Sequence, residues 1–283
     1  MKNLIVIFLF LLTAATLAYG KWHYDNKLEK NHLKAVAAFK QEQQQEAQEQ
    51  KEKMASMKKN KSNSVLDWLK YKSNQEGEVK ISVFRSGVTE GTGSSSLDKH
   101  WTGLLENYLN SQEDIASVSL IDNSFGGYTT QRLVNEDKIK DVLEDKPDLV
   151  MIEPTIINNY VKNVSIDQTN KDVLSFVKRI KKKLPKTLIV IQSTNPTDIK
   201  KFPKGKNKLG YRYKDYATEL KTFSKEKDLN FVDIYSGIDK LKKQNKKNLK
   251  DILSDDRHPN DLGYKYWFET LRTSFEKTKL VTD

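Results

Sequence analysis

The chain of 283 residues contains no cysteine, which excludes disulfide bonds, thiolate metal sites, a cysteine nucleophile and a lipid anchor attached through cysteine. Histidine is also scarce: two of the four histidines, His23 and His32, lie in the polar N-terminal part. His100 and His258 are therefore the imidazoles available for chemistry in the rest of the chain. The sequence shows no metal-ligand cluster and no phosphate-cradling loop, so we expect no metal and no cofactor.

Charge is scarce at the very N-terminus, where a nearly unbroken apolar run over residues 4–18 follows Lys2. This pattern is typical of an export signal or a short membrane anchor. Ala18-Tyr19-Gly20 fits a cleavage site, so we interpret residues 1–20 either as an uncleaved anchor or as a signal peptide that is removed. Both alternatives place the remainder outside the cytoplasm, anchored to the cell membrane or secreted.

Glycine and proline are missing from residues 27–61, which are rich in Lys, Gln, Glu and Ala. This composition favours a solvated helical stalk, to which we assign residues 21–76. Its apolar positions fade after Phe39, so a sustained heptad repeat is absent. We expect the apolar run at 65–69 to dock onto the domain that follows, which we place at residues 77–283.

Positive charge dominates, with 49 Lys+Arg against 38 Asp+Glu and a formal net charge of +11. The lysines are spread along helix faces and loops without interleaved aromatic residues, which argues against a nucleic-acid partner. On an exported protein, such a surface would meet anionic lipid headgroups or an anionic wall polymer. Ordinary solvated helix faces account for the same charge.

After Gly77, short β-branched apolar runs alternate with segments of helical periodicity. The helical segments include Trp101/Leu104/Leu105/Tyr108 and Val173/Val177/Ile180, with the spacing of a buried face. Strands that alternate with helices predict an α/β fold with a doubly wound parallel sheet, in which ligands bind at the carboxyl ends of the strands. The predicted strands are 79–84, 116–121, 148–153, 187–192 and 230–234.

The segment Asp255-Asp256-Arg257-His258 lies near the C-terminus and precedes an aromatic helical stretch. A carboxylate three residues before a histidine can accept the Nδ1 proton of the imidazole and leave Nε2 free as a general base. A histidine that only holds a loop in place explains the pattern about as well. Three further polar segments, at 84–93, 123–130 and 153–159, each follow a predicted strand, and their order together with D-x-x-H is hard to ascribe to chance.

From residue 79 to about 275, these segments together resemble the SGNH/GDSL hydrolase family, particularly exported bacterial members whose first block reads G-S-S-V-T-x-G-T-G. The resemblance implies a flavodoxin-like sheet and a Ser-His-Asp triad that cleaves esters, often acyl groups on carbohydrates or lipids. It implies catalytic roles for Asp255 and His258, and an oxyanion hole that includes Gly127 and Asn158. Asn159 departs from the family, which usually has aspartate there.

The first block is where the sequence departs most from the family. The run V-T-x-G-T-G at residues 88–93 fixes a register that places Gly87 at the nucleophile position, with its N–H in the oxyanion hole, and Arg85 at the leading glycine. Ser86, the neighbouring candidate nucleophile, is displaced by ~3.3 Å and points to the opposite face of the strand unless a bulge turns it back. We hypothesise that Arg85 fills part of the site and pairs with Asp255 or Asp256; a solvent-facing arginine is the alternative.

Two functions follow from this reading. The first is a serine esterase at the cell surface that acts on acylated carbohydrate or another ester, with Ser86, Asp255 and His258 as catalytic residues. The second is a degenerate hydrolase that keeps its crevice to bind an acylated glycan or a protein partner. A further aromatic group follows the fourth predicted strand and would either stack on sugars or pack in the core: Tyr211, Tyr213 and Tyr216.

Overall fold

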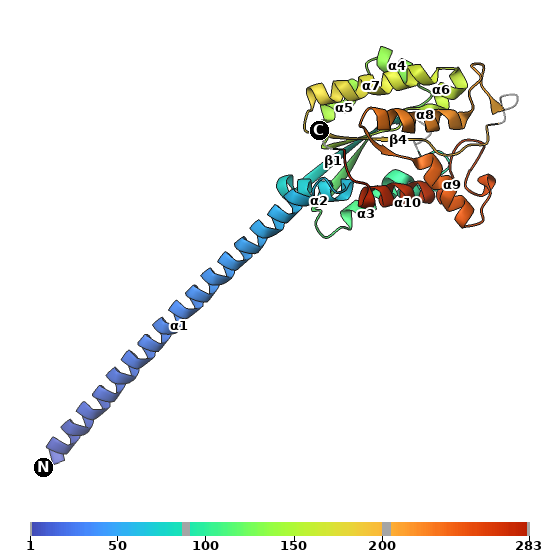
Figure 1. Cartoon of the computed structure of the whole chain (residues 1–283). Coiled ribbons are helices and arrows are strands. Elements are labelled where there is room, and N and C mark those ends of the chain that lie inside the picture. The colour runs from blue at the N-terminus through green and yellow to red at the C-terminus, as the bar shows by residue number, and fades with distance from the viewer. Residues whose placement is uncertain (1, 87–90, 200–204, 282–283) are drawn as a thin grey trace. The chain divides into compact units, whose positions relative to one another are not determined.

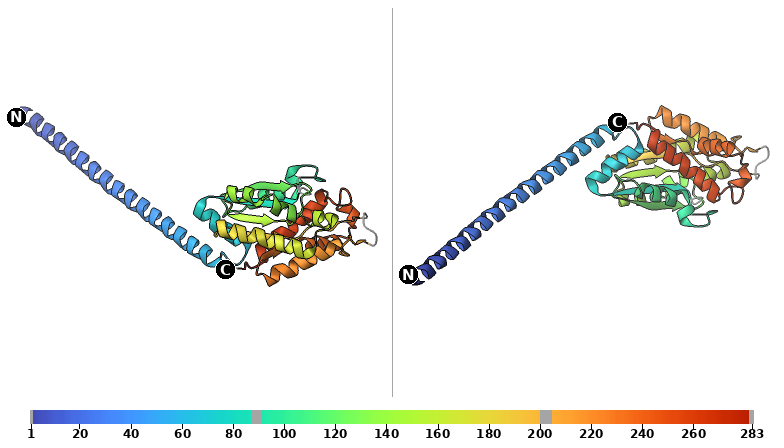
Figure 2. Two further views of the ribbon diagram at one scale, coloured as in Figure 1. Left: turned by 90° about the horizontal axis from the view of Figure 1, so that it is seen from above. Right: turned by 90° about the horizontal axis from the view of Figure 1, so that it is seen from below.

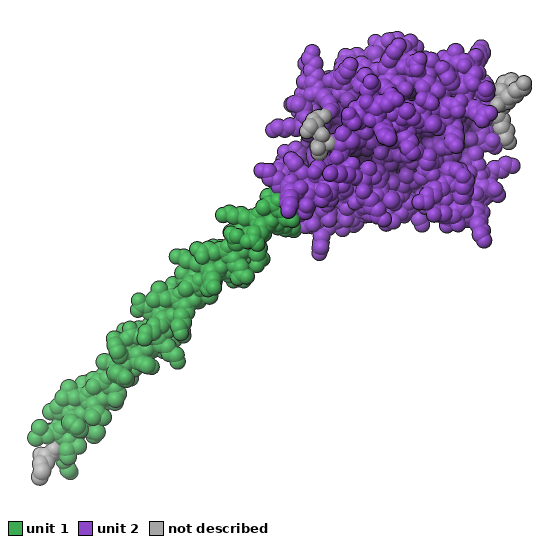
Figure 3. Space-filling model, viewed as in Figure 1, with its two compact units in different colours: residues 1–56 green, residues 57–283 purple. Residues whose placement is uncertain are grey.

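The computed structural model describes residues 2–86, 91–199 and 205–281. It contains two compact units, residues 1–56 and 57–283, which Figure 3 shows in separate colours. The first unit lies within helix α1 (Lys2–Asn60), which has no buried residue. By length and composition this helix is a candidate membrane span, a criterion that an N-terminal signal sequence also meets.

The second unit is built around a five-stranded parallel sheet with the order β2-β1-β3-β4-β5. All five predicted strands are present, and the predicted doubly wound α/β fold is confirmed. The first two strands extend further than predicted at their carboxyl ends, so that Arg85 and Ser86 belong to the first strand. The strands are β1 (Glu78–Ser86), β2 (Ser117–Phe125), β3 (Leu149–Ile152), β4 (Leu188–Gln192) and β5 (Asn230–Val232).

Helices cover both faces of the sheet, and each face has its own hydrophobic core (Figure 1). Figure 2 shows α10 in red over one face and α7 in yellow over the other, so we name them the α10 face and the α7 face. The α10 face carries α2 (Val65–Glu76), α3 (Trp101–Asn110), α9 (Ile234–Gln244) and α10 (Asp261–Lys277). The α7 face carries α4 (Thr130–Asn135), α5 (Ile139–Asp145), α6 (Ile156–Lys162), α7 (Ile166–Lys183) and α8 (Tyr213–Glu226).

The side chains of β1 alternate between these two cores. Ile81 and Val83 belong to the core of the α10 face, whereas Phe84 belongs to that of the α7 face. Because the side-chain period of a strand is two, Arg85 follows Val83 on the α10 face and Ser86 follows Phe84 on the α7 face. This alternation decides which partners the last two residues of the strand find.

Helix α2 packs into the second unit, as the apolar run at 65–69 predicts. Its N-terminus is capped by Ser64, whose hydroxyl oxygen accepts the N–H of Asp67 at 3.0 Å. Val65, Leu66 and Leu69 are buried in the core of the α10 face, and each such side chain contributes about 1.5–3 kcal/mol relative to an exposed one. The second unit therefore includes residues 57–76, which the sequence analysis assigned to the stalk.

Candidate functional site

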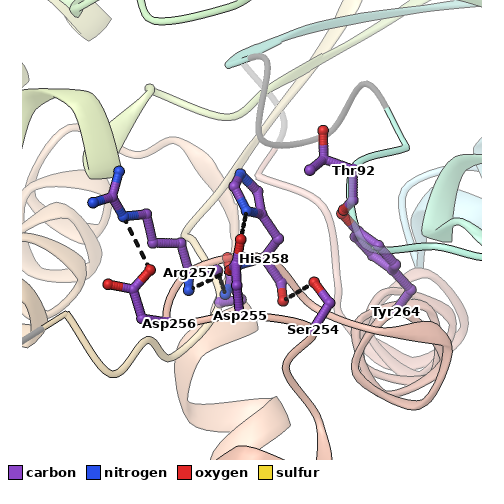
Figure 4. A network of polar contacts seen from close by, with 8 residues as sticks. Thr92, Ser254, Asp255, Asp256, Arg257, His258 and Tyr264 are labelled. Carbon is purple, nitrogen blue, oxygen red and sulfur yellow. Dashed lines mark hydrogen bonds and ion pairs between the residues drawn. The ribbon is translucent and has the colours of Figure 1, made fainter.

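The loop that precedes α10 brings Asp255 and His258 together. The His258 ring Nδ1 lies 2.6 Å from Asp255 Oδ2, and Asp255 Oδ1 accepts the backbone N–H groups of Arg257 at 2.8 Å and His258 at 2.7 Å (Figure 4). Asp255 thus fixes both the loop and the ring. With Nδ1 donating to the carboxylate, the neutral imidazole keeps its lone pair on Nε2, which is the tautomer of a general base.

Asp255 stays ionised in this setting. Partial burial of the carboxyl opposes ionisation, but the hydrogen bonds from the His258 N–H, the His258 ring and the Arg257 N–H outweigh it. The pKa of Asp255 is therefore lowered from its ordinary value. At neutral pH the group is a carboxylate that can stabilise a positive charge on the imidazole.

The loop after β1 touches the His258 loop directly. Gly93 has φ 90°, and a Cβ there would lie 2.3 Å from the carbonyl oxygen of Pro259, so only glycine fits. The Tyr264 hydroxyl donates to the Thr92 carbonyl at 2.8 Å (Figure 4), and Ser95 donates through its N–H and its hydroxyl to Asp261. The first and last motifs of the sequence therefore meet at the carboxyl edge of the sheet.

The second and third motifs meet at the same edge through Asn159 and Lys162. The Asn159 side chain accepts the Thr130 N–H at 3.0 Å and donates to two hydroxyls, so it ties α6 to α4 and α7 as a structural residue. Lys162 Nζ donates to the carbonyl of Gly127 at 2.6 Å, in the turn that follows β2. These contacts hold the turn of Gly127 beside the helix that carries Asn158.

Asn158 lies at the start of α6, and its amide Nδ2 is buried and has no hydrogen-bond partner among the residues that the structure describes. The residue before this helix, Thr155, adopts the left-handed conformation with φ 45° and ψ 36°, which is strained for a β-branched side chain. Its carbonyl accepts the N–H of Asn158 at 3.0 Å. The strained turn thus sets the start of the helix and with it the position of the unpaired amide.

Ser86 lies on the α7 face, away from Arg85. Its side chain is buried, and both its N–H and its hydroxyl donate to Glu153 Oε2, at 3.0 Å and 2.8 Å. Glu153 is itself buried, and burial raises the pKa of its carboxyl despite these hydrogen bonds. Sequence analysis did not assign Glu153 a role, although a carboxylate directly after a buried strand was a signal for one.

The proposed pairing of Arg85 with Asp255 or Asp256 is wrong. The Arg85 guanidinium binds Asp122 of β2 in a bidentate manner, with Nε 2.8 Å from Oδ1 and Nη2 2.5 Å from Oδ2. In the parallel register Arg85 is opposite Ser124, so Asp122 is its diagonal neighbour on the same face. Asp255 contacts His258 instead, and Asp256 pairs with Arg257.

His100, the other histidine of this domain, is buried beside Tyr264, with ring centroids 4.3 Å apart. Its Nδ1 accepts the N–H of Thr102 and thereby caps α3. Burial, together with the positive charge of Arg85, lowers the pKa of His100 to about 3. His100 is therefore a neutral structural residue, which leaves His258 as the imidazole of the site.

Gly87, the predicted nucleophile position and an oxyanion-hole candidate, lies outside the described residues. The aromatic residues after β4 are described: Tyr213 and Tyr216 are buried in the core of the α7 face, and Tyr211 packs against it. Of the predicted site residues, the structure joins Asp255 to His258 and places Ser86, Gly127 and Asn158 at or just after the carboxyl ends of β1, β2 and β3.

Solved structures share this fold. A two-domain esterase (CEX) active on acetylated mannans is 19% identical with a TM-score of 0.58, over 76% of this chain and 55% of that chain. This chain thus spans about half of that protein. A catalytic mutant of Axe2, an acetylxylan esterase from Geobacillus stearothermophilus, is 16% identical with a TM-score of 0.56, over 72% of this chain and 97% of that one. A putative GDSL-like lipase from Parabacteroides merdae is 16% identical with a TM-score of 0.56, over 70% of this chain and 95% of that one.

No curated protein matches the sequence. Residues 88–266, more than half of the chain, match the model of the GDSL-like lipase/acylhydrolase family. The match begins inside the first motif and ends within α10, so it includes Asp255 and His258 and the strands β2 to β5, and it starts just after β1. The chain therefore belongs to the GDSL-like lipase/acylhydrolase family.

Proposed function

We propose that this protein is a GDSL-type esterase of the cell surface that accommodates acyl esters of a polysaccharide and turns them over slowly. The observation that carries the proposal is the 2.6 Å contact between His258 Nδ1 and Asp255 Oδ2, which prepares the imidazole as a base. The substrate class follows the family neighbours that are esterases of acetylated mannan and xylan. The apolar N-terminal part of helix α1 would direct the domain out of the cytoplasm, either as an anchor that is retained or as a signal peptide that is removed.

In the reaction, His258 Nε2 takes the proton of the attacking hydroxyl or water as its oxygen bonds to the acyl carbon. Asp255 stabilises the imidazolium that results. The carbonyl oxygen becomes an oxyanion, which the unpaired amide of Asn158 and the N–H of Gly127 stabilise by donation. The imidazolium then gives its proton to the departing sugar oxygen as the ester C–O bond breaks. Where water attacked, the acyl group leaves at once as a carboxylic acid. Where a hydroxyl attacked, the acyl group stays on that oxygen as an ester until a water molecule, deprotonated by His258 Nε2, releases it as the acid and the hydroxyl regains its proton.

Slow turnover follows from the position of the hydroxyl. Position 87, where the family register expects serine, is glycine. The neighbouring hydroxyl of Ser86 is buried on the α7 face and donates to Glu153, so it has to leave that bond before it can act as a nucleophile. A nucleophile must come within about 3 Å of its base, and most of the rate is lost without one.

The hydrogen bond from Ser86 to Glu153 also favours a second function, a binding module for acylated glycan. If Ser86 stays with Glu153, the site keeps its donors and its imidazole but has no nucleophile. Asn158 would then bind the ester carbonyl in the ground state, and the unpaired buried amide gives it the means.

A fluorophosphonate probe with peptide mapping on the full-length chain tests the proposal. We expect weak labelling at Ser86 that disappears in His258→Ala and in Ser86→Ala, together with slow release of acetate from acetylated xylan. Absence of label combined with retention on acetylated but not deacetylated xylan would establish the binding module instead. If the chain shows no label, releases no acetate and is not retained on acetylated xylan, both functions are rejected.

A further inference from the structure

A groove runs along α10 on the side of the edge strand β5, distinct from the candidate active site. It has a volume of about 680 Å³ and lies between α10, α9 and β5, with Lys240 and Gln244 on one wall and Lys265 and Lys277 on the other. Figure 2 shows α9 beside α10 in the view from below. Asp255, His258 and Asn158 do not line it.

The groove continues into a second hollow of about 310 Å³. The two share Lys221, Phe231, Val232, Ser274 and Thr278, so they form one channel across the end of α10. The second hollow adds Lys225 and Lys279 to the lining. The channel is therefore long and open, which suits an extended ligand better than a compact one.

The lining carries twice as many lysines as carboxylates. Two of its three carboxylates, Asp233 and Glu269, already have partners. Asp233 caps α9 through the N–H of Ser236 and pairs with Lys221 at 3.0 Å, and Glu269 pairs with Arg272 at 2.7 Å. Within the described part of the chain, five groove lysines have no carboxylate partner: Lys225, Lys240, Lys265, Lys277 and Lys279. By contrast, Lys242 and Lys243, on the same helix as Lys240, both pair with Asp239.

Uncompensated lysines in a concave channel create a positive potential that low-dielectric walls focus. A flat membrane can touch only the rim of a channel between two helices. A single flexible chain with closely spaced phosphates can follow the channel and contact several ammonium groups at once. The shape thus selects among polyanions that charge alone would not separate.

From this geometry we infer that the α9/α10 groove binds a single-chain, phosphate-rich wall polymer. This surface is independent of the proposed esterase reaction, because none of its residues belongs to that site. It would hold the domain against the wall while the carboxyl edge of the sheet meets the ester substrate.

Binding of polyglycerol phosphate to the full-length chain in zwitterionic nanodiscs tests this inference. The groove variant combines Lys240→Gln, Lys265→Gln and Lys277→Gln. The control variant combines Lys178→Gln, Lys182→Gln and Lys183→Gln, which remove the same charge from exposed positions on α7, over the opposite face of the sheet. We expect the groove variant to bind about tenfold more weakly or worse, with a shallower dependence on salt, and the control to lose much less.

Equal losses in the two variants, or no binding by the wild-type chain, would overturn the inference. So would binding of phosphatidylglycerol vesicles that depends on the groove lysines while the polymer does not bind. Unfolding temperatures of both variants within a few degrees of wild type show that the fold is intact. Hydrolysis of acetylated xylan, measured on the same samples, reports on the esterase proposal separately.

Discussion

The Ser86 hydroxyl and the Glu153 carboxyl are 2.8 Å apart in the interior of the α7 face, and the Ser86 N–H donates to the same oxygen. This one carboxyl oxygen therefore anchors the end of β1 to the residue that follows β3. The contact engages the hydroxyl that is closest in sequence to the nucleophile position with a buried carboxyl. It makes Glu153 a positioning residue for the end of the first strand.

Removal of this anchor should destabilise the domain. In Glu153→Ala, both Ser86 donors lose their acceptor in a buried setting, so we expect the free energy of unfolding to fall by about 2 kcal/mol or more. Glu153→Gln keeps a carbonyl oxygen for both donors and should cost less than about 1 kcal/mol. Thermal unfolding followed by tryptophan fluorescence measures both. Equal effects of Ala and Gln would show that the hydrogen bonds contribute little.

The pair of Arg85 and Asp122 should respond unequally to loss of either partner. Arg85 is 3% exposed, whereas the Asp122 side chain is 49% exposed. Asp122→Ala leaves a buried guanidinium without a counter-charge and should cost about 3 kcal/mol, but Arg85→Met leaves a carboxylate that water can solvate and should cost less. The double variant should be more stable than Asp122→Ala alone. A double variant that is the least stable of the three would contradict this account.

His100 should make the domain sensitive to acid. Its pKa is about 3 in the folded state, below the ordinary 6.5, so the unfolded chain binds the extra proton between these values and stability falls as pH falls through this window. From pH 7 to pH 5 this group alone lowers stability by about 2 kcal/mol. Unfolding of wild type and His100→Gln at both pH values isolates the effect. The wild type should lose more than the variant, and parallel losses would refute the assignment.

The amide of Asn158 should act on the transition state. In a catalytically competent background, Gly87→Ser, the further change Asn158→Ala is expected to lower kcat by about 100-fold with little change in KM, because the oxyanion forms after binding. Hydrolysis of p-nitrophenyl acetate measures both constants. Asn159→Ala serves as a contrast, since that side chain holds Thr130 and Thr169 and its loss should show mainly in stability. A rise in KM alone would mean that Asn158 only binds substrate.

Local sequence patterns predicted the strands of the second unit and the docking of residues 65–69, because β-branched runs and apolar spacing report burial directly. The contact of Asp255 with His258 was also predictable, since only two residues of one loop separate them. The partner of Arg85 was not, because only Asp255, Asp256 or solvent were considered and Asp122 of the neighbouring strand was not. The register of β1 against β2 places Asp122 diagonally opposite Arg85 on the same face. The sequence alone does not give this register, because both strands extend beyond their predicted ends. The same extension of β1 placed Ser86 beside Glu153.

Introduction of serine at position 87 tests the central claim most directly. If the imidazole and the oxyanion donors are in place and only a hydroxyl is missing, Gly87→Ser should hydrolyse p-nitrophenyl acetate at least about tenfold faster than the wild-type chain. The gain should vanish when His258→Ala is added. A Gly87→Ser protein that folds normally and hydrolyses no faster than wild type would contradict the account.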